Sequence, residues 1–313
     1  MKKRIAITLG DPGGVGAEVT LKSLPVIAGI TRPLLIGDKP VIESACEMLG
    51  IELDMGLCDF LGTGAISSTG FARNIPSAEG GHAAVSYIRK AVELARANAV
   101  DAIVTAPISK ESLKMAGYAW PGHTEMLAEL TGTQHFAMML CGGPIRVILV
   151  TTHTAMRNVP SLITADRVLE TILLAKKACS MLGLAGPRIA VAGLNPHAGE
   201  SGIFGNEEQT AIFPAIAAAK AEGVVVAGPF PSDTLFHRVY KGEFDIVVCM
   251  YHDQGLIPLK MIAFDSGVNV TVGLPIIRTS PDHGTAFDIS WKGAANPSSM
   301  AEAIKFAARL QKP

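Results

Sequence analysis

A run of apolar residues gives way to polar ones at residues 245–253, which read Asp-Ile-Val-Val-Cys-Met-Tyr-His-Asp. A short, continuous apolar run with β-branched residues is typical of a strand buried on both faces. The same pattern occurs twice more, because His153 and His197 also follow short apolar runs, at residues 147–150 and 189–192. Strands of this kind are covered by helices on both sides, so the pattern predicts an α/β fold.

The rest of the chain fits this prediction, because short β-branched runs alternate with longer helical stretches and form βαβ units around a mostly parallel sheet. We expect strands at residues 4–9, 33–36, 102–105, 146–151, 188–192, 245–250 and 269–272, and helices at 83–98, 164–182, 206–221 and 299–310. A length of 313 residues suggests two domains or one large body.

Composition excludes several classes of protein. The chain has 27 Lys and Arg against 28 Asp and Glu, so it lacks the basic excess of a nucleic-acid or anionic-membrane binder. No apolar run is long enough for a spanning helix or a signal peptide. The five cysteines are widely spaced and odd in number, which favours reduced thiols in a cytoplasmic protein.

Three histidines follow predicted strands and could meet at one edge of the sheet. They are His153, His197 and His252. The carboxyl ends of parallel strands form the ligand crevice of open α/β sheets. Three neutral imidazoles with an open position would suit a catalytic metal. Each histidine could instead be a hydrogen-bonded residue at a strand end, and the spacing alone does not separate the two readings.

Two further clusters suit an anionic substrate. Residues 122–125, Gly-His-Thr-Glu, open a helix, where free backbone N–H groups can bind an anion. Lys260 and Arg278 could bind a phosphate or carboxylate, although both could be ordinary surface residues.

A glycine-rich segment at residues 10–16 follows the first strand and reads Gly-Asp-Pro-Gly-Gly-Val-Gly. Its glycines do not have the G-x-G-x-x-G spacing of a dinucleotide-binding Rossmann loop. We therefore interpret it as a tight turn from strand to helix.

These segments resemble the 4-hydroxythreonine-4-phosphate dehydrogenase family of pyridoxal-phosphate biosynthesis. The matching blocks run in family order along nearly the whole chain, at residues 10–16, 105–110, 122–125, 151–153, 193–200, 232–236, 250–255 and 278–286. The most specific of them read Asn-Pro-His-Ala-Gly-Glu at 195–200 and Tyr-His-Asp-Gln-Gly at 251–255.

The resemblance implies two α/β/α domains like those of isocitrate and isopropylmalate dehydrogenases, with the active site in the interdomain cleft at a homodimer interface. On this basis we expect one domain at residues 1–120 plus 270–313, and a second at residues 121–269 that carries the metal-ligand histidines.

The resemblance also implies roles for individual residues. His153, His197 and His252 match ligands of a divalent metal (Zn, Mg or Co), and His123, Thr124, Lys260, Asn269 and Arg278 match substrate contacts. His283, Gly284, Thr285 and Asp288 match a loop that binds the adenosine of NAD or NADP. Asp233, Asp253 and, less directly, Lys110 are catalytic candidates. The chain departs from the family at Trp291, where glycine is usual.

The implied reaction is oxidation of 4-phosphooxy-L-threonine at its C3 alcohol to a β-keto acid, which loses CO₂ to give 3-amino-2-oxopropyl phosphate. The metal would lower the pKa of the alcohol as a Lewis acid. A paralogous dehydrogenase of phosphorylated threonate or erythronate is the nearest alternative, because amino and hydroxyl groups at C2 can both ligate a metal. A hydrolase with three histidines on a metal is the alternative from another class.

Overall fold

The computed structural model describes residues 2–312 and divides them into two compact units. The first unit contains residues 2–134 and 274–312, and the second contains residues 135–273. The predicted boundaries lay at 120/121 and 269/270. In the structure the first boundary falls later in the chain, because helix α5 (His123–Thr131) contacts helix α3 (Ala78–Arg96) and belongs with the first unit.

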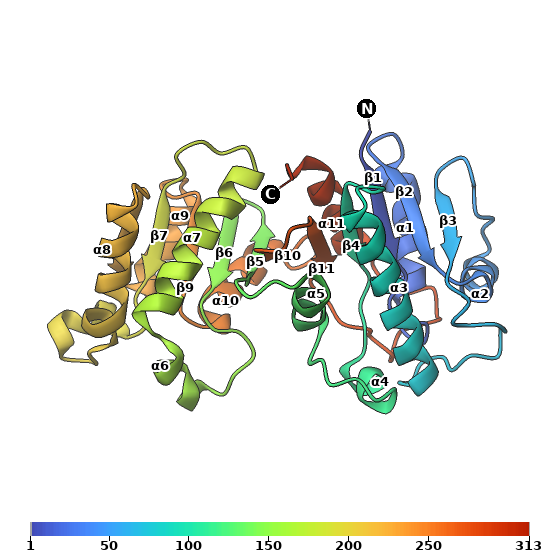
Figure 1. Cartoon of the computed structure of the whole chain (residues 1–313), viewed down its shortest axis with the longest axis horizontal. Helices are drawn as coiled ribbons and strands as arrows, with labels where there is room; N and C mark the ends of the chain where they lie inside the picture. The colour runs from blue at the N-terminus through green and yellow to red at the C-terminus, as the bar shows by residue number, and fades with distance from the viewer. Residues whose placement is uncertain (1, 313) are drawn as a thin grey trace. The chain divides into compact units, whose positions relative to one another are not determined.

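The first unit is built on a parallel sheet with the strand order β3-β2-β1-β4-β11. Helices α1 and α11 contact each other, and α11 and α3 each contact the central strands β1 and β4 (Figure 1). The strands are β1 (Arg4–Thr8), β2 (Arg32–Gly37), β3 (Asp59–Gly62), β4 (Ala102–Thr105) and β11 (Arg278–Pro281). The remaining helices are α1 (Gly16–Ile27), α2 (Lys39–Leu49), α4 (Lys110–Met115) and α11 (Ser298–Arg309).

The second unit has the strand order β10-β5-β6-β9-β7-β8. Strand β5 runs antiparallel to both β10 and β6, and the other pairs are parallel. The strands are β5 (Ala137–Gly142), β6 (Ile145–Leu149), β7 (Ile189–Ala192), β8 (Val226–Phe230), β9 (Ile246–Cys249) and β10 (Val268–Val272).

Helices of the second unit pack on this sheet and bury its core. Helix α7 (Ala165–Met181) contacts β6, β7 and β9, while α10 (His252–Ala263) contacts β5, β6 and β9. The others are α6 (Val159–Leu162), α8 (Phe213–Ala221) and α9 (Ser232–Tyr240), with short turns η1 (Met156–Asn158), η2 (Pro196–Gly202) and η3 (Glu208–Ile212). One core cluster joins side chains of β5, β6, β7 and β9 to Leu235 of α9 and Leu256 of α10.

All seven predicted strands are present within one or two residues of their predicted bounds. The four strands missed are β3, β5, β8 and β11. The sequences of three of them explain the omission, because β5 is rich in methionine and small residues, β8 contains Gly-Pro, and β11 reads Arg-Thr-Ser-Pro. Such residues have low strand propensity, and their pairing depends on tertiary contacts.

All five cysteines are free, and all except the half-buried Cys46 are buried. Among residues 2–312, no helix is both long enough and apolar enough to span a bilayer.

Candidate active site

The first unit places a buried cation at the end of its sheet. Arg278 begins β11, and its side chain is 1% exposed. Its Nε and Nη2 atoms donate to Oγ1 of Thr105, at 3.1 and 2.7 Å, and Thr105 ends the neighbouring strand β4. Burial lowers the pKa of Arg278 to about 9, against the opposing influence of Glu125. The guanidinium is still charged at neutral pH, and a buried charge of this kind attracts an anion.

His123 lies in the same unit at the first position of α5, directly after the N-cap Gly122. Its Nε2 atom is buried and has no hydrogen-bond partner among the described residues. Burial holds the pKa of His123 well below its ordinary value, the Arg278 charge lowers it further, and a backbone bond at Ala106 opposes both effects. The ring is therefore neutral at pH 7 and has one nitrogen available for a ligand. Thr124, next to it, is half-buried.

The second unit holds the other two predicted substrate contacts. Asn269 lies on β10, and its Oδ1 atom is buried without a hydrogen-bond partner among the described residues. Lys260 lies in α10, half-buried, with its Nζ atom 5.9 Å from the ring centroid of Phe264. Buried polar atoms normally find a partner, so the orphaned atoms of His123 and Asn269 both suit polar groups of a ligand.

Two of the three predicted metal ligands lie together. His153 follows β6, His252 begins α10, and the centroids of their rings are 5.4 Å apart. The Nδ1 atom of His252 is 2.7 Å from Oδ1 of Asp253. A carboxylate on one ring nitrogen fixes the ring and leaves the other nitrogen for a metal.

His197 has a different setting, exposed in the turn η2, with its ring centroid 6.1 Å from that of Phe204. Across residues 2–312, no group of three His, Cys, Asp or Glu side chains is placed so that it could hold a metal. The structure thus brings His153 and His252 together but not His197, and the three-histidine metal site remains a prediction.

The three predicted catalytic residues are exposed side chains. Asp233 is exposed in the first turn of α9, and Lys110 is exposed at the first position of α4. Asp253 contacts another predicted site residue, because its Oδ1 atom is 2.7 Å from Nδ1 of His252. The catalytic roles of Asp233, Asp253 and Lys110 remain predictions.

The predicted cofactor loop lies against the glycine-rich turn of the first unit. The backbone N–H of Val15 donates to the carbonyl of Thr285 at 3.0 Å. A Cβ atom on Gly14 would lie 2.9 Å from Cβ of Thr285, so this close approach requires glycine. His283, Gly284 and Asp288 are exposed on the same loop. Gly14 therefore packs against this loop, whereas Gly10 and Gly16 closely approach the backbone of Pro107 and Leu9.

Trp291 closes the cofactor loop in a left-handed conformation, with φ of 58°. This conformation is the one that glycine adopts without strain. The indole Nε1–H donates to the carbonyl of Pro12 at 2.9 Å, and the ring packs on Phe71 with centroids 5.3 Å apart. The Arg73 guanidinium lies over the same indole, 4.6 Å from its centroid.

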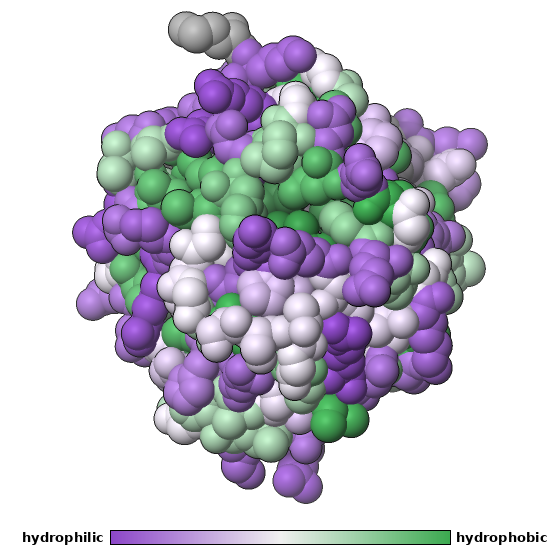
Figure 2. All heavy atoms as spheres, turned by 90° about the vertical axis from the view of Figure 1, so that its right-hand side faces the viewer, coloured by the Kyte–Doolittle hydropathy of each residue, from purple (hydrophilic) through white to green (hydrophobic). Residues whose placement is uncertain are grey.

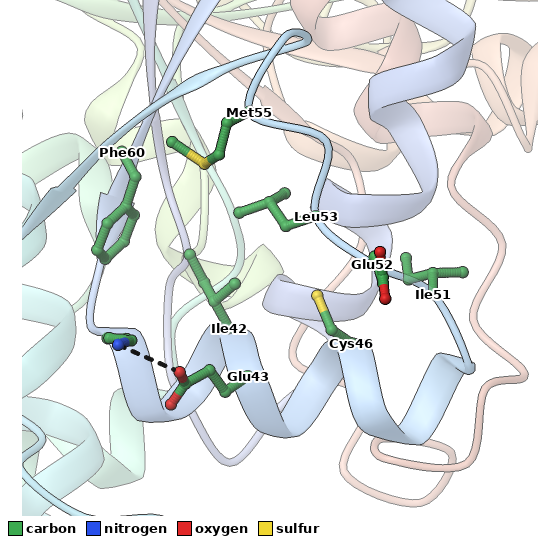
Figure 3. Close-up of a pocket in the computed structure, with 9 residues that line it drawn as sticks. Ile42, Glu43, Cys46, Ile51, Glu52, Leu53, Met55 and Phe60 are labelled. Carbon is green, nitrogen blue, oxygen red and sulfur yellow. Dashed lines mark ion pairs between the residues drawn. The ribbon is translucent and has the colours of Figure 1, made fainter.

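A separate apolar pocket lies between α2, β3 and the segment that joins them. Figure 2 shows apolar side chains gathered on this side of the first unit, and Figure 3 shows Ile42, Leu53 and Phe60 converging on the pocket. Its volume is about 400 Å³, and the Lys39–Glu43 ion pair at 3.5 Å lies at its edge. None of the predicted site residues lines it.

Comparison with known proteins decides the family. The sequence model described as "Pyridoxal phosphate biosynthetic protein PdxA" matches residues 29–307. This chain belongs to the PdxA family. The predicted resemblance is therefore confirmed.

Curated relatives of this PdxA family member carry two different names. A protein of Desulfosudis oleivorans, named 4-hydroxythreonine-4-phosphate dehydrogenase, is 48% identical over 97% of this chain and 94% of its own length. A protein of Cupriavidus necator, named D-threonate 4-phosphate dehydrogenase, is 46% identical over 98% of this chain and 96% of its own length. Both are dehydrogenases, which confirms the predicted class of enzyme.

Solved structures confirm the predicted fold class. A 4-hydroxythreonine-4-phosphate dehydrogenase from Klebsiella pneumoniae is 42% identical, with a TM-score of 0.91 over 99% of this chain and 98% of that one. A beta-decarboxylating dehydrogenase from Thermococcus kodakarensis is 16% identical, with a TM-score of 0.53 over 97% of this chain and 82% of that one. At this low identity the second similarity concerns the fold alone. This chain therefore shares its fold with a β-decarboxylating dehydrogenase.

Sequence reasoning misses three side chains that the structure places near the predicted residues. Thr105 binds Arg278, and its place at the end of a predicted strand could have indicated it. Glu208 and Gln254 bind the backbone of the segment before His197. No local pattern distinguishes Glu208 from other carboxylates in a helix, because its role depends on contacts across 13 and 14 residues of chain.

Proposed function

We propose that this protein is an NAD(P)-linked, metal-dependent dehydrogenase of 4-phosphooxy-L-threonine in pyridoxal phosphate biosynthesis. The reaction oxidises the C3 alcohol to a β-keto acid, and loss of CO₂ then leaves 3-amino-2-oxopropyl phosphate. The observation that carries the proposal is the 48% identity, over nearly the whole chain, to a relative named for this substrate. The buried, charged Arg278 supports a substrate that carries an anionic group.

In this proposal the side chains of the first unit bind and orient the substrate. Arg278 donates to the phosphate, and Thr105 holds the guanidinium in the required direction. The neutral His123 offers its buried Nε2 to a polar group of the substrate. In the second unit, Asn269 Oδ1 accepts a hydrogen bond from a substrate donor, and Lys260 supplies a further positive charge.

The proposed metal ligands are His153, His252 and His197. Imidazole nitrogen suits Zn²⁺ or Co²⁺ better than Mg²⁺, which prefers oxygen ligands, and the neighbouring rings of His153 and His252 fit this donor set. A bound divalent metal would lower the pKa of the substrate alcohol as a Lewis acid. Asp253 would hold the His252 ring so that Nε2 faces the metal.

The proposed dinucleotide site is the loop that contains His283, Gly284, Thr285 and Asp288. A Cβ atom on Gly284 would meet nothing within 4 Å, so the loop is open on this side. The exposed His283 ring can stack on or hydrogen-bond to an adenine. Bound NAD⁺ or NADP⁺ would accept the hydride from C3.

D-threonate 4-phosphate is the second candidate substrate. The relative named for it is 46% identical to this chain, only slightly less than the relative named for 4-hydroxythreonine-4-phosphate. The two substrates differ in the group at C2, and the anion-binding side chains of this protein suit both.

A spectrophotometric assay of NADH or NADPH formation tests the proposal. The purified protein with Zn²⁺ or Co²⁺ is given either 4-phosphooxy-L-threonine or D-threonate 4-phosphate. We expect kcat/KM to be at least about tenfold higher for the first, and Arg278→Ala to raise its KM about 10- to 100-fold without changing KM for the dinucleotide. Faster turnover of D-threonate 4-phosphate would overturn the substrate assignment, and equal effects on both KM values would overturn the role of Arg278.

We further propose that the protein is a homodimer with a shared active site. Helix α10 and the residue after it expose Ile257, Met261 and Phe264, with 59%, 83% and 74% of each side chain accessible. A spacing of four and three residues places these side chains on one helix face. Apolar side chains exposed together on one face are typical of protein interfaces.

A further inference from the structure

We infer that Glu208 and Gln254 are positioning residues that fix the segment carrying His197. The inference deepens the proposed function, because it concerns how this chain presents a proposed metal ligand. It is based on side chains that bind backbone groups of residues 193–195, which lie two to four residues before His197.

Glu208 binds this segment from one side. Its side chain is buried, and Oε1 accepts from the backbone N–H groups of Leu194 and Asn195 at 2.8 and 2.7 Å. Its Oε2 atom accepts from Nδ2 of Asn195 at 2.9 Å. A Cβ atom on Gly199 would lie 2.6 Å from this Oε2, so the chain after His197 also closes on the carboxylate. One buried carboxylate therefore contacts the chain both before His197, at residues 194–195, and after it, at Gly199.

Gln254 binds the same segment from another element. Its Nε2 atom donates to the carbonyl of Gly193 at 2.6 Å and to Oγ of Ser232 at 2.8 Å. Its Oε1 atom accepts from the backbone N–H of Met250 at 2.5 Å. Side chains thus bind backbone groups of three consecutive residues, 193–195. The N–H of Gly193 also donates to the carbonyl of Phe230 on β8, at 2.9 Å.

The segment needs such support because its backbone is strained. The five residues from His197 to Ser201 have φ between 40° and 79°, and only one of them is glycine. Non-glycine residues in this left-handed region persist only where the surroundings hold them. Without Glu208 the turn can relax to ordinary conformations, and the His197 ring would move with it.

The same hydrogen bonds extend toward the other two histidines. Met250, bound by Gln254, precedes His252 by two residues, and its carbonyl accepts from Oγ1 of Thr151 at 2.7 Å. Thr151 precedes His153 by two residues. Loss of the Gln254 hydrogen bonds should therefore disturb the segments before His153 and His252 as well as the turn that contains His197.

The test compares Glu208→Gln with the matched control Glu207→Gln in the full-length protein. Among the described residues, one hydrogen bond to Glu207 is found in this region, from Nδ2 of Asn195 at 2.7 Å. Glu208→Gln instead replaces one of two engaged acceptor oxygens by an NH₂ group among N–H donors. Hydrogen exchange of peptides covering residues 193–205 is measured without metal, and Co²⁺ binding is measured by calorimetry and visible absorption.

We expect Glu208→Gln to raise exchange in this segment at least tenfold, to weaken Co²⁺ binding about 10- to 100-fold and to alter the Co²⁺ spectrum. In Glu207→Gln, the exchange rates of this segment and the Kd for Co²⁺ should stay within about twofold of those of the parent protein. If the two variants behave alike in exchange and in Co²⁺ binding, the inference is overturned. If Glu208→Gln does not fold, Gln254→Glu replaces it, because it keeps an acceptor for Met250 while removing the donor to Gly193, and the same increase in exchange is expected.

The two proposals can fail separately. Unchanged Co²⁺ affinity in His197→Ala would remove the proposed metal role of His197. Exchange without metal would still decide whether Glu208 fixes the segment, because that measurement does not involve a bound ion.

Discussion

His123 shows how its surroundings determine the state of a single side chain. The ring lies at the start of α5, its Nε2 atom is buried, and the Arg278 guanidinium is near enough to disfavour a second positive charge. Both effects favour the neutral imidazole. A neutral ring can accept a hydrogen bond from a substrate or donate one, whichever tautomer it adopts.

This environment predicts a pH dependence of stability. The pKa of His123 in the folded protein lies below its ordinary value of 6.5, so the unfolded chain binds the proton first as the pH falls. The free energy of unfolding should therefore be fully retained above about pH 6.5 and fall by up to about 1.4 kcal/mol per pH unit below it. Urea denaturation between about pH 8 and pH 5 measures this loss, and His123→Gln should remove that part of the slope.

The control for this measurement is His82→Gln. His82 is exposed on α3 of the same unit, so this variant makes the same replacement outside the buried site, and an equal change of slope in both variants would contradict the role of His123. An unchanged slope in His123→Gln would mean that another group is responsible for the loss.

At the scale of elements, the strand-end histidines were predictable because parallel strands share an edge. His153, His197 and His252 all follow strands of the second unit, β6, β7 and β9. The separate setting of His197 was not predictable, since the left-handed turn after β7 and its hydrogen bonds to Glu208 depend on contacts between distant segments. Strand β11 was missed for a related reason, because its Arg278 is buried through tertiary contacts that its sequence does not reveal.

Trp291 is another residue whose effect could not be judged from its sequence context. A bulky residue in place of the usual glycine suggests a distorted loop. In the structure the indole instead ties the cofactor loop to Pro12 and Phe71. The left-handed backbone costs about 1–2 kcal/mol, and the hydrogen bond and ring contact return about the same amount.

Trp291→Gly should therefore change the free energy of unfolding only slightly while loosening the cofactor loop. We expect a 3- to 10-fold higher Kd for NAD⁺ or NADP⁺ by calorimetry, because the freer loop loses more conformational entropy on binding. The KM for the phosphorylated substrate should stay within about twofold. Trp120→Phe, at the other tryptophan of the chain, is the control and should bind the dinucleotide as before. An unchanged Kd in Trp291→Gly would separate this residue from the cofactor site.

At the scale of the whole molecule, the two units hold different parts of the proposed chemistry. The first contains Arg278, His123 and the cofactor loop, and the second contains the three histidines and Asn269. The second unit also carries the exposed apolar face of α10, so the surface proposed for dimerisation and the proposed metal ligands belong to one compact unit. His252 begins the helix that presents Met261.

This arrangement predicts that Met261→Glu converts a dimer into a monomer. A carboxylate at the most exposed position of the face would have to be buried without a partner, which costs several kcal/mol at an interface. Sedimentation velocity at about 10 µM should show the mass fall to that of one chain, and specific activity should fall with the fraction of dimer if each site is shared. Met55→Glu, at a methionine that is 60% exposed in the first unit, should remain dimeric. A dimer that survives Met261→Glu would place the interface elsewhere, and a fully active monomer would show that each chain carries a complete site.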